Sequence, residues 1–132
     1  MNKNTDLGLL ILRITLGVLM LLHGIAKLKG VSFIEGTLED KGLPSFMAYG
    51  VYITEIIMPL LILIGYRTRL ASAGYAFGVL FAIFLVHSGD IFTLTPHGGW
   101  GIELLGLYLF GAIALFFTGG GKMAISTKNK WD

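Results

Sequence analysis

The sequence contains no cysteine and few charged residues of either sign. The absence of thiols excludes disulfide bonds, thiolate metal sites and redox chemistry carried out by the protein's own cysteines. Asp, Glu, Lys and Arg together make up 14% of the 132 residues, whereas a soluble domain has about 25%. Hydrophobic residues make up 55%, and the mean hydropathy is +0.78. The chain therefore has too little polar surface to cover a water-facing globule, which predicts that lipid is its second solvent.

The charge pattern also lacks the footprint of a nucleic-acid-binding protein. The net charge is only +2, and the basic residues lie at the ends of apolar stretches rather than in one run. The length predicts a single membrane domain over residues 1–132. An apolar stretch follows Lys3, but no small-x-small cleavage site comes after it, so we interpret it as an uncleaved first helix.

Four apolar stretches are long enough to cross a bilayer, and they cover residues 7–26, 46–65, 70–86 and 102–118. Each reaches about the 17–25 residues that span roughly 30 Å of hydrocarbon. None alternates with a period of two, which favours helices, because only helices or closed barrels satisfy their backbone in lipid. The short link 66–69 makes the second and third helices antiparallel neighbours. The predicted fold is an all-α integral membrane four-helix bundle with antiparallel helices.

The distribution of Lys and Arg predicts the orientation of this bundle. The side that holds both termini carries Lys3, Arg67, Arg69, Lys122, Lys128 and Lys130. The opposite side carries Lys27, Lys29 and Lys41. Because loops rich in Lys and Arg stay inside, both termini are predicted to be cytoplasmic. Gly74, Gly78 and Ala82 form a ladder of small residues on the third helix, which is predicted to pack within the bundle.

Arg13 and Glu55 are charged residues that lie well inside the apolar stretches rather than at their ends. A charge at mid-bilayer costs at least ~2.5–3.5 kcal/mol, so it is usually paired or functional. Counting depth along the first and second helices predicts that Arg13 and Glu55 lie within reach of each other. One interpretation is an ion pair that fixes the helix register. The other is a carboxylate that carries protons or binds a ligand.

A second group of polar residues is expected at the external ends of the first, third and fourth helices. It comprises His23, Lys27, His87 and Glu103, with Phe92, His97 and Trp100 in the loop before the fourth helix. Each residue alone would be a solvated group at a helix end, but together they predict an external polar pocket. No His-x-x-His or Glu-x-x-His spacing and no haem attachment motif is present, so neither a metal nor a haem is predicted.

Several motifs follow one another in a recognisable order. They are Arg13, the run His23-Gly24-Ile25-Ala26-Lys27-Leu28, Glu55, the turn Gly65-Tyr66-Arg67-Thr68-Arg69, His87, Glu103 and Gly119-Gly120-Gly121-Lys122. This order resembles the DoxX family of bacterial four-helix inner-membrane proteins. The resemblance implies a multi-pass protein of the inner membrane with a link to respiratory redox chemistry, since relatives belong to a thiosulfate:quinone oxidoreductase and to complexes that counter oxidative stress. The tail 123–126 departs from the family's usual Ser-hydrophobic-Asp ending.

The leading hypothesis is therefore that the protein is a membrane subunit of a quinone-linked redox or oxidative-stress system. If it takes part in an enzyme, it is at most one subunit of a quinone-linked oxidoreductase. Its polar site near the outer face would bind a quinone head group through His23, Lys27, His87 and Glu103, while Arg13 and Glu55 relay a proton inward. Phe92 and Trp100 would flank the ring, and a redox partner subunit would deliver electrons. No catalytic residue is assigned, and a homo-oligomer is left open. The alternatives are a non-enzymatic assembly factor or scaffold and, less favoured, a transporter of protons or a small solute.

Overall fold

The protein is mainly helical in the computed structural model, which describes residues 3–132. The elements in chain order are α1 (Thr5–Ala26), η1 (Lys27–Lys29), α2 (Ser32–Asp40), η2 (Ser45–Tyr49), α3 (Gly50–Tyr52), η3 (Ile53–Ile57), α4 (Met58–Ile64), α5 (Thr68–Val86), η4 (Ser88–Asp90) and α6 (Glu103–Thr118). The residues described contain no strand, and one isolated β-bridge joins Leu94 to Trp100 in the loop before α6. The all-α prediction is confirmed.

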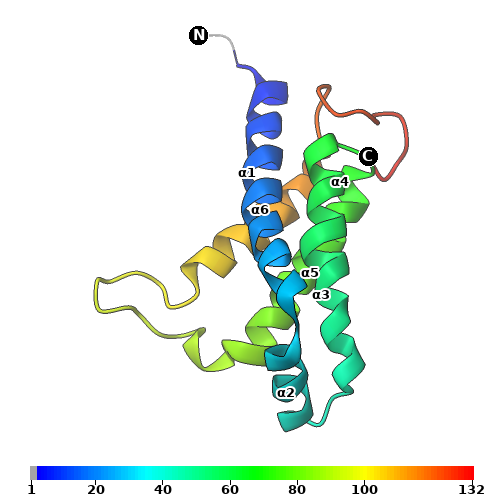
Figure 1. The fold of residues 1–132 in the computed structure, drawn as a ribbon. Helices are drawn as coiled ribbons and strands as arrows, with labels where there is room; N and C mark the ends of the chain where they lie inside the picture. Colours follow the sequence, from blue (N-terminus) through cyan, green and yellow to red (C-terminus); the bar gives the residue numbers. More distant parts are fainter. Residues whose placement is uncertain (1–2) are drawn as a thin grey trace.

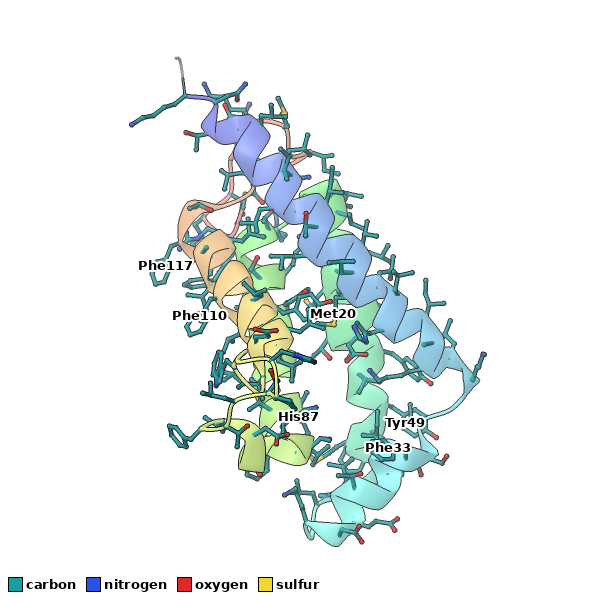
Figure 2. All side chains as sticks on the ribbon, turned by 90° about the vertical axis from the view of Figure 1, so that its left-hand side faces the viewer. Met20, Phe33, Tyr49, His87, Phe110 and Phe117 are labelled. Carbon is teal, nitrogen blue, oxygen red and sulfur yellow. The ribbon has the colours of Figure 1, made fainter. Side chains whose placement is uncertain are left out.

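Within the described residues, three helical rods are long and apolar enough to cross a membrane. They cover Thr5–Lys29, Ser45–Ile64 and Thr68–Val86, while the apolar helix Glu103–Thr118 is shorter. The four predicted stretches thus all form helices, although the fourth is shorter than the others. Large apolar side chains point outward along them, and Figure 2 shows Phe110 and Phe117 projecting from α6. This outward apolar surface is what a lipid-facing bundle requires.

The second rod changes its helical geometry several times. It begins as a 3-10 helix in η2, becomes α-helical in α3, widens to a π-helix in η3 and returns to α-helix in α4. Pro59 supplies the physical reason for the π turn. A proline has no N–H, and its ring clashes with the carbonyl four residues earlier, here that of Glu55. The backbone widens before Pro59, and this places Glu55 in the widened turn.

Both ends of the described chain lie at one end of the bundle, and α2 lies at the other (Figure 1). We call these the termini end and the α2 end. At the termini end, the tail that follows α6 runs back to the turn between α4 and α5, where the amide of Ile125 donates to the carbonyl of Ile64. The predicted placement of both termini on one side agrees with this arrangement.

Glycines bring the rods close together along their length. A Cβ added to Gly74 would lie 2.9 Å from Met58 Sδ, and one added to Gly78 would lie 2.5 Å from the Cβ of Thr54. The predicted ladder on the third helix therefore packs within the bundle, as expected. Around these contacts lies the main core, which includes Leu16, Met20, Ile62, Tyr75, Val79, Tyr108, Leu109 and Leu115.

Candidate functional site

The predicted pair between Arg13 and Glu55 is wrong, because Arg13 binds backbone carbonyls instead. Its side chain is 1% exposed. Nε donates to Ile62 O and Nη2 to Leu63 O, both at 2.9 Å, and Nη1 donates to Gly120 O at 3.3 Å. Ile62 and Leu63 belong to the last turn of α4, whose carbonyls lack the regular partner four residues on, although the amide of Gly65 also donates to Ile62 O at 3.2 Å. Arg13 therefore closes the end of α4 and ties it to the tail.

Glu55 forms its ion pair with Lys27, at the α2 end. Lys27 Nζ lies 2.5 Å from Glu55 Oε2, and the two side chains are 30% and 16% exposed. The end of α1 is held in place by Tyr52, whose hydroxyl donates to the carbonyl of Lys27 at 2.8 Å. Gly24 lets α1 approach the π turn, since an added Cβ there would meet the carbonyl oxygen of Glu55 at 2.5 Å.

This ion pair lines a cavity of about 700 Å³ between the rods. The other polar residues on its wall include His23 and His87, and most of the remainder is apolar. In Figure 2, His87 lies on one side of this space, Phe33 and Tyr49 lie on the other, and Met20 lies above them. A cavity of this size with a few convergent polar groups is typical of a small-molecule site.

Two buried tyrosines form the wall of the cavity toward the core. The ring of Tyr108 meets His23 edge-to-face, with centroids 6.2 Å apart, and meets Tyr75 in the same way at 6.3 Å. The Tyr75 hydroxyl donates to Leu16 O at 3.0 Å. Sequence reasoning missed these tyrosines and Tyr52. A tyrosine inside an apolar stretch is a signal for them, because its hydroxyl needs a partner when it is buried.

The predicted external group divides in two. His23, Lys27 and His87 line the cavity, and Glu55 joins them. Glu103 is exposed and its carboxylate lies against Gly99, outside the cavity.

The loop before α6 holds the rest of the predicted group away from the cavity. His97 is exposed, and Phe92 is 98% exposed. Trp100 donates from Nε1 to Ile91 O at 2.6 Å, and its ring covers Gly106. This loop closes on itself and extends away from the bundle (Figure 1). The sequence showed that these residues were near the cavity along the chain but not that the loop turns away from it.

The chemistry available in the cavity is hydrogen-bond donation and proton exchange. The ammonium of Lys27 donates only, the carboxylate of Glu55 accepts, and each histidine ring does either. His87 also faces Asp90, with Nδ1 3.4 Å from Oδ2. Among residues 3–132, no group of three or more His, Cys, Asp or Glu side chains is arranged to hold a metal ion.

Comparisons with known proteins place this arrangement in context. The family model described as DoxX matches residues 8–88. The protein "Putative oxidoreductase CatD" of Bacillus subtilis (strain 168) is 37% identical over 131 residues, which cover 95% of this chain and 89% of that protein. "Inner membrane protein YqjF" of Escherichia coli (strain K12) is 34% identical over 88 residues, which cover 67% of this chain and 68% of that protein. No solved structure matches the chain.

Proposed function

The chain belongs to the DoxX family as a multi-pass protein of the bacterial inner membrane, and we propose that it serves as a membrane subunit of a quinone-linked redox system. The observation that carries this proposal is the Lys27–Glu55 pair, which lines a mainly apolar cavity of about 700 Å³ together with His23 and His87. The printed name of the relative from Bacillus subtilis, "Putative oxidoreductase CatD", supports the redox assignment.

The residues of the cavity fit the two parts of a quinone. Its ring carbonyls need donors, which Lys27, His23 and His87 supply. Its isoprenoid tail needs an apolar channel to the lipid. Phe33 and Phe46 line the cavity and are each 72% exposed, so the apolar wall continues onto the outer surface of the bundle. A tail can therefore leave the cavity without crossing a polar layer.

The chain's own residues would bind the head group and manage its protons. A bound quinone supplies two-electron chemistry that is coupled to protons. Lys27 stabilises the charged carboxylate of Glu55 and donates to a ring carbonyl, while Glu55 takes up or releases a proton at its Oε2 atom. Electrons come from a redox partner subunit in this proposal, since the chain has no cysteine to carry them.

The test compares carboxylates and histidines inside and outside the cavity. Binding of a short-tailed quinone analogue to the full chain in detergent is measured for Glu55→Gln and His87→Ala. Glu103→Gln and His97→Ala serve as matched controls, because both residues are exposed and outside the cavity. We expect about 10-fold weaker binding or more for the cavity variants, since a hydrogen bond to a charged group contributes about 1.5–3 kcal/mol. Unchanged affinity in correctly folded cavity variants refutes the proposal.

One observation favours a second candidate, a non-enzymatic assembly factor or scaffold. Arg13 carries a buried charge that only closes α4 and the tail, so at least this residue acts in packing. In a pure scaffold, Glu55→Gln would lower the folded yield as Arg13→Gln does, and no variant would affect a ligand. A folded Glu55→Gln protein that has lost quinone affinity excludes this candidate.

We also propose that the termini end faces the cytoplasm. Most of the chain's Lys and Arg residues outside the apolar stretches lie at that end, which is the usual inside signal. Reporter fusions after residue 132 and within the loop 91–101 test this orientation. The orientation is contradicted if a reporter that works only outside the cytoplasm is active when it is fused after residue 132.

A further inference from the structure

A second pocket lies at the termini end, away from the cavity that Lys27 and Glu55 line, and it is polar rather than apolar. It has a volume of about 370 Å³, and three cations line it: Arg69, Lys122 and Lys130. Within residues 3–132, none of these three has a carboxylate within 4.0 Å. We propose that this pocket binds the phosphate group of an anionic lipid headgroup.

The guanidinium of Arg69 is held at the pocket by the chain itself. Nε donates to Phe116 O and Nη1 donates to Lys130 O, both at 2.7 Å. Its plane also lies over the Phe116 ring, 5.2 Å from the centroid. Both acceptors are uncharged carbonyls, so no carboxylate within residues 3–132 neutralises Arg69, and the two hydrogen bonds position its guanidinium before a ligand arrives.

The two carboxylates of the pocket do not cancel this charge. Asp132 accepts from Arg67 Nη1 at 2.9 Å, from Ser126 Oγ at 2.7 Å and from the amide of Asn129 at 2.7 Å, so Arg67 already balances it. Asp6 accepts from the amide of Lys122 at 2.9 Å. Among the side chains that line the pocket, one carboxylate is therefore left against three cations, and the main-chain oxygen of Asp132 already accepts from the amide of Gly120 at 3.2 Å.

Glycines after α6 let the tail fold closely around the pocket. Gly119 and Gly121 line it and adopt φ values of +75° and +79°, a region that other residues rarely enter. An added Cβ at Gly119 would meet Asp132 O at 2.9 Å, and one at Gly120 would meet Thr68 Oγ1 at 2.7 Å, so the chain itself fills the space beside them.

The position of the pocket indicates a lipid as the source of the phosphate. It is formed mainly by the tail after α6, packed on the ends of α1, α5 and α6, and the ends of helices that cross the bilayer lie at the depth of the headgroups. Phe117 precedes the pocket residue Thr118 and is 76% exposed, so acyl chains can cover it. Basic pockets between membrane helices on the cytoplasmic side commonly bind anionic headgroups.

The test measures binding of phosphatidylglycerol to the full chain by native mass spectrometry, with phosphatidylcholine as the reference lipid. Lys122→Gln with Lys130→Gln removes two exposed cations from the pocket. Lys29→Gln with Lys41→Gln removes two exposed lysines from the α2 end, so both double variants have the same net charge. We expect the pocket variant to bind phosphatidylglycerol about 30-fold more weakly and the control variant to retain its affinity.

Two results overturn the proposal. One is an equal loss in both double variants, which would mean that only overall charge attracts the lipid. The other is wild-type protein that does not prefer phosphatidylglycerol to phosphatidylcholine. Inorganic phosphate is tested alongside: displacement of the bound lipid supports recognition of the phosphate group itself, while phosphate binding without lipid binding refutes a lipid source.

Discussion

Replacing Gly24 with alanine tests the contact that brings Lys27 and Glu55 together. The new Cβ would lie 2.5 Å from the carbonyl oxygen of Glu55 and 2.6 Å from Ile56 Cγ1. Ordinary contact begins at 3.4 Å, so α1 and the π turn must separate by about 0.9 Å. The nearest atom is backbone, which cannot turn aside as a flexible side chain would. The substitution therefore displaces α1 from the turn that carries Glu55.

The expected change in the free energy of unfolding is the difference between two opposing effects. Overpacking of a tight contact costs about 1–3 kcal/mol, and alanine in place of glycine inside a helix gains about 0.5–1 kcal/mol. We expect Gly24→Ala to be less stable than wild type by up to about 2.5 kcal/mol and to bind a quinone analogue more weakly. Gly8→Ala is the matched control, because it lies in the same helix and an added Cβ there meets nothing within 4 Å.

Thermal unfolding in detergent, followed by the same quinone-binding assay, measures both effects. Gly8→Ala should be as stable as wild type or slightly more stable, with unchanged affinity. If Gly24→Ala matches Gly8→Ala in both measurements, the close approach of α1 to the π turn does not shape the site, and the argument from Gly24 to the ion pair fails.

Two further predictions concern the charged residues. Because Glu55 pairs with Lys27, Lys27→Glu combined with Glu55→Lys should recover part of the folded yield that either single variant loses in fluorescence-detected size exclusion. Arg13→Glu combined with Glu55→Arg should recover none of the folded yield, since a carboxylate at position 13 would face carbonyls. Recovery in this second swap would instead support a pair between positions 13 and 55. Burial alone would raise the pKa of Asp132, but hydrogen bonds from Ser126, Asn129 and Arg67 lower it to about 2 from 3.8. A carboxyl group with a lowered pKa stabilises the fold above pH 3.8 and loses this effect as the pH falls toward 2. The protection of the Ile125 and Ser126 amides against hydrogen exchange, relative to an unfolded chain at the same pH, should therefore fall over that range and in Asp132→Asn at neutral pH. Equal protection in the variant contradicts the role of the network.

The sequence was sufficient to predict the helices because their signal is local. An apolar stretch must bury its backbone polar groups in a helix when lipid surrounds it, and this holds whatever its neighbours are. The ladder of Gly74 and Gly78 is equally local, since small residues at a spacing of four mark a close contact on one helix face. The partners of the charges depend instead on which neighbouring helices supply acceptors. Arg13 shows this, because its partners are the backbone carbonyls of residues 62, 63 and 120. Every residue has a backbone carbonyl, so the sequence does not mark these three as partners.

The predicted Arg13–Glu55 pair was wrong first of all in depth, because the carbonyls that Arg13 binds lie seven and eight residues beyond Glu55, about 10–12 Å along the second rod. Depth counting assumes a regular α-helix, in which each residue turns the side-chain direction by about 100°. The π turn at Ile53–Ile57 adds one residue to a turn, so the face that continues toward Ile62 and Leu63 is rotated from the face that carries Glu55. The carbonyls of Ile62 and Leu63 meet Arg13, and the carboxylate of Glu55 turns to Lys27. The π turn before Pro59 places the carboxylate of Glu55 beside the ammonium of Lys27 in the cavity. This agrees with the general observation that π turns often mark functional sites. Proline four residues after a membrane carboxylate is therefore a signal to search for a partner outside the regular helical register.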